Sequence, residues 1–317
     1  MKKMYAKEFE IDERLVYMLL ENQCPHWADL PLKSVISNGT ENALFRLGSE
    51  YVVRLPRTDP GESIHNECEW LPKISPFLKI PISVPLFKGK PDWSYPWPWT
   101  VSKWHLGYNP NFERKREHDL LAKDLARFLN ALHGIKLANG PLSKRGIPLK
   151  ERDMPTRAAI NELQGEIDIT SITALWEQLS NVPSWSKDPV WVHGDFLPDN
   201  ILAQSFRLSA VIDFSMMGMG DPACDLIIAW SLLSPHSRKI FKDNLENIDE
   251  DTWERGRGWA LSIALIMLSY YRNRSYSLTF LAKRMIAHVL DNVVELYIPP
   301  KRKKSKLFLF FERLFKK

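Results

Sequence analysis

Hydrophobic residues show two different periodicities along the first hundred positions. Between residues 8 and 23 they recur at helical spacing, which predicts an N-terminal helix. From residue 35 onward apolar and polar positions alternate, and a Gly-Ser-Glu turn separates the runs 44–47 and 51–55. This alternation predicts antiparallel strands joined by tight turns. Residues 62–73 return to a helical pattern.

The remainder of the chain has mainly helical periodicity. The predicted helices are 119–133, 156–164, 171–179, 253–272 and 279–296. A short strand-rich island at 190–213 interrupts them. A small strand-rich part followed by a larger helical part predicts an α+β protein of two lobes. The boundaries that we expect are a lobe at 1–100, a connector at 101–106, a second lobe at 107–300 and a tail at 301–317.

The composition is that of a folded globular protein. Hydrophobic residues make up 44% and charged residues 26% of the 317 positions, which excludes global disorder. The three cysteines, Cys24, Cys68 and Cys224, are too few and too scattered for a disulfide framework, and this favours a reducing compartment. No apolar run has the length of a membrane span, and no signal-peptide pattern follows the first lysines. We therefore expect a cytoplasmic protein.

The net charge of +5 is concentrated in the tail. Residues 301–317 alone carry +7, so the first 300 residues are slightly acidic at −2. A body of this charge is a poor candidate for binding a nucleic-acid backbone, and no nucleic-acid partner is expected. The tail combines basic residues with an apolar stripe at helical spacing. It is suited to lie on an anionic membrane surface, to dock on the helical lobe, or to mediate self-association.

Candidate chemistry lies in the strand-rich island. Asp195 and Asn200, five positions apart, are flanked by apolar runs, and Asp213 ends the next apolar run. Two short strands joined by a hairpin would bring these three side chains together at one end of the strand pair. Phosphoryl transfer needs such a set: a carboxylate that accepts the proton of the attacking hydroxyl, and oxygen ligands for Mg²⁺ on the nucleotide phosphates. Kinase catalytic loops have the same spacing between their Asp and their metal-binding Asn.

Three motifs carry a family resemblance: His193-Gly194-Asp195 with Asn200, Ile212-Asp213-Phe214, and Gly220-Asp221-Pro222-Ala223 with Asp225-Leu226. In these motifs the chain resembles the aminoglycoside phosphotransferase and choline kinase-like family, over roughly residues 15–297. The resemblance implies a bilobal protein-kinase-like fold, with Asp195 as the catalytic aspartate and Asn200 and Asp213 as metal ligands. His193 is then a structural member of the loop. Ser215 departs from the glycine that protein kinases have in this place.

The nucleotide is expected on the strand-rich lobe. The turn at Asn38, Gly39 and Thr40 permits a close approach of phosphates, although a simple hairpin turn explains it equally well. Arg54 lies in a predicted strand where kinases have their phosphate-binding lysine, and the alternative is a solvent-facing edge residue. Its partner on the next helix is Glu67 or Glu69, and the resemblance favours Glu67.

The connector would then be the hinge between the lobes. We expect Ser102 and Trp104 in this connector to contact the nucleotide base through backbone groups. The sequence leaves ATP and GTP as alternatives.

Five residues are candidates for contact with the acceptor: Asp199, Asp225, Glu254, Trp230 and Tyr270. Each has a structural alternative. An acid at 225 is well placed to cap a helix or to bond the catalytic loop, and this role is favoured. Glu254 also fits a capping box that begins at Asp251, and aromatic residues at helical spacing are usually core.

Together these features predict a small-molecule kinase that transfers the γ-phosphoryl group of Mg-ATP or Mg-GTP to an acceptor hydroxyl. The resemblance implies an antibiotic such as an aminoglycoside or a macrolide. A kinase of a hydroxylated metabolite, choline-like or sugar-like, is one alternative, and a catalytically silent nucleotide-binding protein is another. A protein kinase is disfavoured, because only seven residues separate Asp213 from Asp221, too few for a peptide-docking activation segment.

Overall fold

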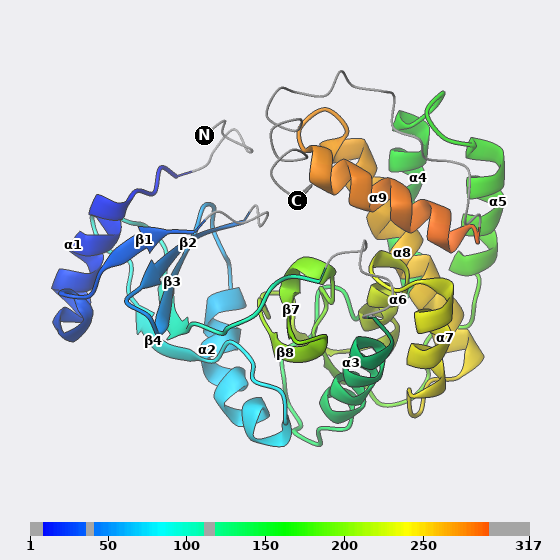
Figure 1. Ribbon diagram of the computed structural model, residues 1–317. Helices are drawn as coiled ribbons and strands as arrows, with labels where there is room; N and C mark the ends of the chain where they lie inside the picture. Colours follow the sequence, from blue (N-terminus) through cyan, green and yellow to red (C-terminus); the bar gives the residue numbers. More distant parts are fainter. Residues whose placement is uncertain (1–8, 36–40, 111–117, 292–317) are drawn as a thin grey trace, which may run out of the picture.

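A five-stranded antiparallel sheet forms most of the N-terminal part of the molecule (Figure 1). The computed structural model describes residues 9–35, 41–110 and 118–291. The strand order is β1-β2-β3-β5-β4, and every neighbouring pair is antiparallel. The strands are β1 (Leu32–Ser34), β2 (Asn42–Leu47), β3 (Tyr51–Pro56), β4 (Pro85–Gly89) and β5 (Trp99–Lys103).

Strand alternation decides which side chains of β2 and β3 are buried. Phe45 lies opposite Val53, and both are buried in the first hydrophobic core. Arg54, between the buried Val53 and Leu55, therefore points to the other face of the sheet. Gly48 makes the connecting turn with a φ of 58°, a left-handed conformation that glycine adopts without strain. The predicted pair of strands and its turn are confirmed.

Helix α1 (Glu13–Gln23) covers one end of this sheet. Leu19 and Leu20 on its inner face belong to the first core. The helix begins five residues later than the predicted segment 8–23, because Asp12 caps it by accepting a hydrogen bond from the Leu15 backbone N–H at 2.8 Å. The apolar periodicity extended past the cap, so it placed the start of the helix too early.

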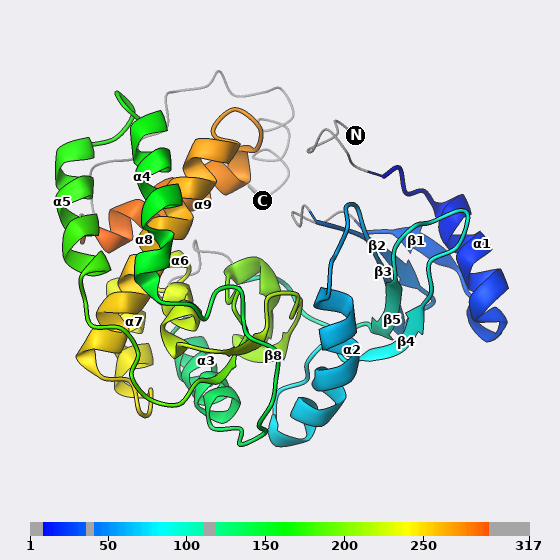
Figure 2. The same cartoon turned by 180° about the vertical axis from the view of Figure 1, so that it is seen from behind.

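Helices make up most of the C-terminal part (Figure 2). The long helix α8 packs against α9, α4 and α5 in the second hydrophobic core. The helices are α3 (His118–His133), α4 (Asp153–Glu162), α5 (Ile169–Ser180), α6 (Ile228–Ser231), α7 (Pro235–Asp243), α8 (Glu250–Tyr271) and α9 (Tyr276–Val289). The predicted α+β fold, with a small sheet before a larger helical part, is confirmed.

The apolar run 226–233 is not the long helix that its composition suggests. A 3-10 segment, Pro222–Ile227, is followed by the single turn of α6. Asp221 begins this segment by accepting a hydrogen bond from the Ala223 backbone N–H at 2.9 Å. The run is apolar on every side because it is buried on every side.

Four short strands form the island within the helical part. Strand β6 (Val190–Val192) pairs with β9 (Gly218–Gly220), and β7 (Ile201–Gln204) pairs with β8 (Arg207–Val211). The loop between β6 and β7 and the residues after β8 therefore leave the island side by side, since Ile201 pairs with Val211. This pairing places the predicted catalytic residues at one end of the hairpin.

Helix α2 (Ser63–Ile74) contributes to both parts of the molecule. Glu67 on this helix faces Arg54 of the sheet, whereas Leu71 and Ile74 pack into the second core. The ring of Trp70 lies 5.1 Å from that of Trp191 in β6. A single helix thus contacts both the sheet and the strand-rich island, and a lobe boundary at residue 100 remains a prediction.

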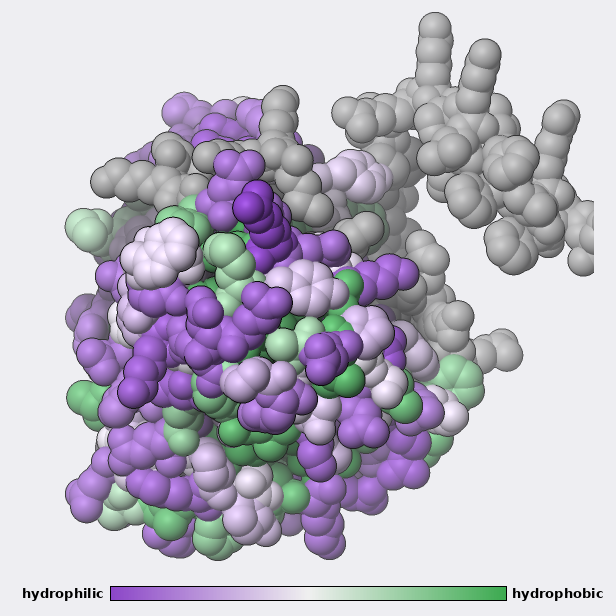
Figure 3. All heavy atoms as spheres, turned by 90° about the vertical axis from the view of Figure 1, so that its left-hand side faces the viewer, coloured by the Kyte–Doolittle hydropathy of each residue, from purple (hydrophilic) through white to green (hydrophobic). Residues whose placement is uncertain are grey.

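The outer face of the sheet-bearing part is covered mostly by hydrophilic side chains, with hydrophobic ones in between (Figure 3). Among the helices that the structure describes, none has both the length and the hydropathy needed to cross a bilayer. The tail at 301–317, for which we predicted membrane binding or self-association, lies outside the described residues.

The start of α8 provides a test of helix capping. Asp249, rather than the predicted Asp251, is the N-cap, and its carboxylate accepts a hydrogen bond from the Thr252 backbone N–H at 2.8 Å. Replacing Asp249 by alanine should lower the free energy of unfolding by about 0.5–2 kcal/mol at pH 7, measured by urea denaturation. The bonds from Thr252 lower the pKa of Asp249, so this contribution exists above the carboxylate's unfolded pKa of about 3.9 and disappears as the pH falls through the lower folded value.

Asp251→Ala is the matched control, because Asp251 lies in the same turn of α8. A larger loss of stability in Asp251→Ala than in Asp249→Ala would contradict the assigned cap. A loss in Asp249→Ala that persists unchanged at acidic pH would contradict the role of the ionised carboxylate.

Candidate active site

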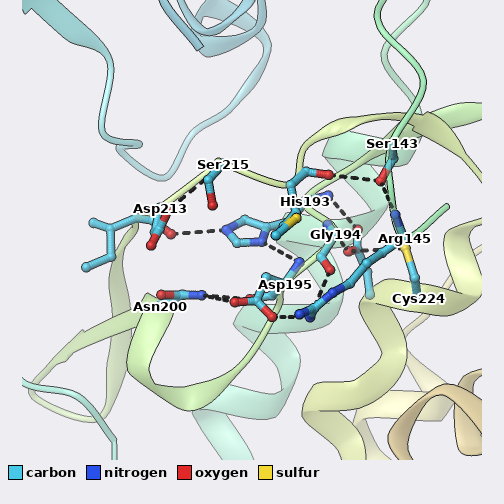
Figure 4. Close-up of polar contacts among 12 residues, drawn as sticks. Ser143, Arg145, His193, Gly194, Asp195, Asn200, Asp213, Ser215 and Cys224 are labelled. Atoms are coloured by element: carbon cyan, nitrogen blue, oxygen red, sulfur yellow. Dashed lines mark hydrogen bonds and ion pairs between the residues drawn. The ribbon is translucent and has the colours of Figure 1, made fainter. Parts of the chain in front are cut away.

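The loop between β6 and β7 carries Asp195 into the space between the two parts of the molecule. Gly194 precedes it with a φ of 80°, and a Cβ atom there would overlap the carbonyl oxygen of Met216. Glycine is therefore required at this position on two counts, backbone conformation and space. Pro198–Asn200 forms a 3-10 turn at the other end of the loop. The turn brings Asn200 back toward Asp195 (Figure 4).

Asn200 and Arg145 orient the Asp195 carboxylate from two sides (Figure 4). Asn200 donates from Nδ2 to the Asp195 backbone oxygen at 2.8 Å and to Oδ2 at 3.0 Å. Arg145 donates from Nη1 to Oδ1 of the same carboxylate. About a quarter of each side chain of the Arg145–Asp195 pair is exposed. The carboxylate is thus fixed in orientation and still reachable from solvent.

Asp213 lies two residues after the end of β8 and faces the same space. Its φ of 58° is unusual for a residue other than glycine and turns the chain sharply after the strand. A third of the side chain is exposed, and Arg54 Nη1 lies 3.5 Å from Oδ1. The three predicted residues, Asp195, Asn200 and Asp213, therefore come from the ends of two neighbouring strands and lie around one site.

Arg54 connects Asp213 to helix α2. Its Nη2 donates to Glu67 Oε2 at 2.6 Å, and Glu67 is almost fully buried. Burial raises the pKa of the Glu67 carboxyl, and the guanidinium of Arg54 opposes that shift. The second oxygen of Glu67 is buried and has no hydrogen-bond partner in the described part of the chain. Glu69, the other candidate, bonds Lys73 on the exposed side of α2.

A buried carboxylate holds the backbone of the catalytic loop. Asp225, which is fully buried, accepts hydrogen bonds from the backbone N–H groups of His193 at 2.9 Å and Gly194 at 2.8 Å. His133 Nε2 lies 3.0 Å from the same carboxylate. His193 in turn accepts a bond from the Asp195 backbone N–H on Nδ1, at 3.1 Å. Its Nε2 must then carry the proton that it shares with the Ile212 carbonyl oxygen at 3.1 Å.

A cavity of about 300 Å³ lies beside Arg54, between the sheet and the helical part. Residues of both parts line it. From the N-terminal part come Glu41, Asn42, Arg54 and Ser63 among others, and from the C-terminal part Lys144, Ser215 and Met216. The cavity thus opens next to Asp213 and is bordered by two cationic side chains, Arg54 and Lys144, and by two carboxylates, Glu41 and Asp59. This mixed lining suits a phosphate group that arrives together with a divalent cation.

Residues 34–259 match the sequence pattern that defines the phosphotransferase enzyme family. The chain belongs to this family. Over 122 residues, 37% of this chain, it is 28% identical to an aminoglycoside 3′-phosphotransferase of Salmonella typhimurium. It is 29% identical over 122 residues to an aminoglycoside 3′-phosphotransferase of Escherichia coli. Both matches span 45% of the relative's length.

Solved phosphotransferase structures share the fold over most of this chain. A GDP complex of an aminoglycoside 2′-phosphotransferase superposes with a TM-score of 0.71 at 17% identity, covering 89% of this chain and 98% of the other. The macrolide 2′-phosphotransferase MphH from Brachybacterium faecium gives a TM-score of 0.60 at 18% identity, covering 90% and 99%. These likenesses confirm the predicted kinase-like fold.

Two predicted nucleotide contacts in the connector have other partners. Ser102 lies within β5, where Val52 on one side and Pro85 on the other are its strand neighbours. The backbone N–H of Trp104 donates to the Glu50 carbonyl oxygen at 2.6 Å and is not free for a nucleotide base. The sheet continues through Lys103, and contact of these two residues with a nucleotide base through other backbone groups stays a prediction. Asn38, Gly39 and Thr40 lie outside the described residues.

Two of the predicted acceptor residues do not face the site. Asp225 and Trp230 are fully buried, and neither has surface for a ligand. Glu254 lies 3.5 Å from Arg257 on the same helix. Tyr270, at the far end of α8, packs edge-on against Tyr271. Asp199 lies in the 3-10 turn, where its carbonyl oxygen accepts from Asn109 at 2.8 Å.

The pair Asn200 and Asp213 fits a magnesium ion delivered with a nucleotide. Asn200 uses its Nδ2 to bond Asp195, which leaves the amide oxygen for a metal, and Asp213 adds a carboxylate. Within the described ranges, no cluster of three or more His, Cys, Asp or Glu is suited to hold a metal alone. Mg²⁺ in phosphoryl-transfer sites is usually bound by one or two protein groups together with substrate phosphates, so two protein ligands suffice.

Arg145 is the main residue of the site that the sequence did not reveal. It lies 50 positions before Asp195, in a Ser-Lys-Arg-Gly segment between predicted helices. No spacing rule connects that segment to the catalytic loop. The one available signal was indirect: residues 193–202 include neither lysine nor arginine, although phosphoryl transfer calls for positive charge.

Asparagine at position 225 should loosen the catalytic loop. The amide would turn a donor toward at least one of the two backbone N–H groups, and each charge-assisted bond that is lost costs about 1.5–3 kcal/mol. We expect the free energy of unfolding of Asp225→Asn, measured in urea, to fall by about 3 kcal/mol or more. Asp243→Asn, at an exposed ion pair with Lys239, should change it by less than about 1 kcal/mol. Equal losses in the two variants would contradict the anchoring role of Asp225.

Proposed function

We propose that this protein is a kinase that transfers the γ-phosphoryl group of a nucleoside triphosphate to a hydroxyl group of a small molecule. The observation that carries this proposal is the convergence of Asp195, Asn200 and Asp213, with Arg54 held between Asp213 and Glu67. Membership of the phosphotransferase family supports it. The predicted alternative of a catalytically silent protein is less consistent with a complete set of these groups.

Each residue has a defined part in the proposed reaction. Asp195 accepts the proton of the attacking hydroxyl and aligns its oxygen with the γ-phosphorus. Arg54 contacts the phosphates, and Glu67 positions the Arg54 guanidinium. Asn200 and Asp213 would hold Mg²⁺, which supplies charge neutralisation on the triphosphate when bound. Asp225 and His193 act through the backbone of the loop and touch no reacting atom.

A purine nucleotide is the proposed phosphoryl donor. Related structures have been solved with GDP, with ADP and with ATP. The cavity beside Arg54 lies next to Asp213 and thus on the side from which a triphosphate must reach the metal ligands. ATP and GTP remain alternative donors.

For the acceptor, we propose an antibiotic hydroxyl, of an aminoglycoside or a macrolide, in line with the relatives. One observation favours a second candidate, a less cationic hydroxylated metabolite. Two of the three carboxylates predicted as acceptor contacts are engaged within the protein: Asp225 is buried, and Glu254 is paired with Arg257. A panel of aminoglycosides, macrolides and hydroxylated metabolites, assayed by ADP or GDP release and by the shift in melting temperature, separates the two.

Asp195→Asn should lower kcat by about 10²–10⁴-fold, because a general base typically contributes that factor. Nucleotide affinity should be retained, since the phosphate-binding residues Arg54 and Asp213 are untouched. Steady-state kinetics with the best acceptor and calorimetry with ADP measure the two quantities. Asp188→Asn, at an exposed position just before β6, is the control and should keep the wild-type kcat. Undiminished turnover in Asp195→Asn would refute the assigned role.

Arg54→Met should weaken nucleotide binding roughly 10- to 100-fold, because a charge-assisted contact is worth about 1.5–3 kcal/mol. The single variant leaves Glu67 buried without its partner, so the double variant with Glu67→Gln tests binding in a protein without that unpaired charge. Both should show the loss by calorimetry with ADP and Mg²⁺. Arg14→Met, at an exposed position of α1, should bind normally. Normal affinity in the double variant would exclude Arg54 as a phosphate ligand.

A further inference from the structure

The catalytic loop lacks a cation of its own. From His193 to Met217 the one lysine or arginine is Arg207, and it bonds Asp124 through two nitrogens, at 2.6 and 2.8 Å. His193 is buried and uses both ring nitrogens within the protein. The proposed reaction nevertheless builds up negative charge on the phosphoryl oxygens beside Asp195. A positive group from another segment must therefore act there if the site supplies one.

Arg145 is in the right position to supply this positive charge beside Asp195. Its Nη1 contacts the Asp195 carboxylate and lies 3.4 Å from the Gly194 carbonyl oxygen. Its Nε and Nη2 have no hydrogen-bond partner among the residues that the structure describes, and a quarter of the side chain is exposed. The guanidinium thus holds the proposed base with one nitrogen and leaves further N–H groups for a ligand. Arginine is the side chain suited to this, since its five donors lie in a rigid plane.

The backbone that carries Arg145 is fixed rather than free to swing. Ser143 donates from Oγ to the Met216 carbonyl oxygen at 2.9 Å, and the same Oγ accepts from the backbone N–H groups of Arg145 and Gly146, at 3.2 and 3.0 Å. The Gly146 carbonyl oxygen accepts from the Asp221 backbone N–H at 2.9 Å. The segment 143–146 is therefore part of the site framework (Figure 4).

The neighbouring residue extends the positive charge toward the nucleotide. Lys144 lines the cavity beside Arg54 and Ser215. Two consecutive cations thus approach the site from the helical part, one at the cavity and one at the proposed base. This arrangement suits phosphoryl transfer, because the phosphoryl group starts on the nucleotide side, near Lys144, and ends on the acceptor side, near Arg145.

We propose that Arg145 is a further catalytic residue that binds the phosphoryl group during its transfer while it holds Asp195 in line. The inference rests on the proposed kinase function. In the step, the acceptor oxygen bonds to the γ-phosphorus as the bond from that phosphorus to the bridging oxygen breaks. The leaving nucleoside diphosphate keeps the electron pair, and the hydroxyl proton passes to Asp195. Arg145 exchanges no proton and stabilises the charge on the non-bridging oxygens.

The test uses hydrolysis of ATP or GTP by the full-length protein with Mg²⁺, so that water replaces the unidentified acceptor. Arg145→Met should lower kcat for phosphate release about 10²–10³-fold with little change in KM, as expected for an interaction made in the transition state. Arg145→Lys, which keeps the charge but not the planar fork, should lose less. Added guanidinium ion at millimolar concentration should restore part of the rate in Arg145→Met and none in Asp195→Asn.

Arg127→Met is the matched control, because Arg127 is exposed on α3, where it lies 3.4 Å from Asp124, and it contacts none of the residues assigned to the site. It should hydrolyse the nucleotide at the wild-type rate. Melting temperatures with and without ADP verify that every variant folds and binds nucleotide. If Arg145→Met folds and keeps the wild-type kcat, or if its loss lies entirely in KM, the catalytic role is overturned and the kinase proposal stands. If hydrolysis is equally fast in wild type and Asp195→Asn, the kinase proposal itself fails, and the role of Arg145 fails with it.

Discussion

A single guanidinium joins the sheet, the helix α2 and the catalytic island. Arg54 contacts the buried Glu67 of α2 at 2.6 Å and lies 3.5 Å from Asp213. It therefore links α2 to a residue that lies 159 positions after Arg54 in the sequence. A buried ion pair of this kind contributes little net stability, because desolvation of both charges offsets most of their attraction. Its value lies in orientation: the strand, the helix and Asp213 can form these contacts together only at one relative placement of the two parts.

The catalytic loop follows the same logic with hydrogen bonds. A buried carboxylate without partners would be very costly, so Asp225 is stable only where two backbone N–H groups and His133 converge on it. That requirement fixes the backbone at His193 and Gly194, and with it the direction in which Asp195 leaves the loop. Both polar networks therefore act mainly by excluding other arrangements of the site. Any such arrangement would leave the buried charge of Glu67 or Asp225 without a partner.

Local patterns predicted the parts of the site that lie close together in sequence. The spacing of Asp195 and Asn200 and the strand before Asp213 sufficed to bring these three residues together, and Arg54 lies on the face of its strand that turns toward α2. Their catalytic roles stay a prediction. Contacts across the fold were beyond such rules. Arg145 reaches Asp195 from an irregular segment, and Trp230 is buried because the run around it folds as a 3-10 segment and one helical turn. The capping-box pattern at Asp251 and Glu254 placed the start of α8 two residues too late, because the structure uses Asp249 as the cap.

The charges of the site are consistent with a role for two arginines in the proposed phosphoryl transfer. A triphosphate that approaches Asp195 and Asp213 meets two carboxylates. A phosphate charge about 5 Å from a carboxylate is repelled by about 3 kcal/mol at the effective dielectric constant of a protein surface. Arg145 in contact with Asp195 and Arg54 near Asp213 cancel most of that repulsion before any metal binds. Glu67 in turn keeps Arg54 in place and offsets part of the positive charge of the Arg54 guanidinium. Glu41 and Asp59 line the adjoining cavity as well, so the site keeps an excess of carboxylates that a divalent cation carried by a nucleotide would offset.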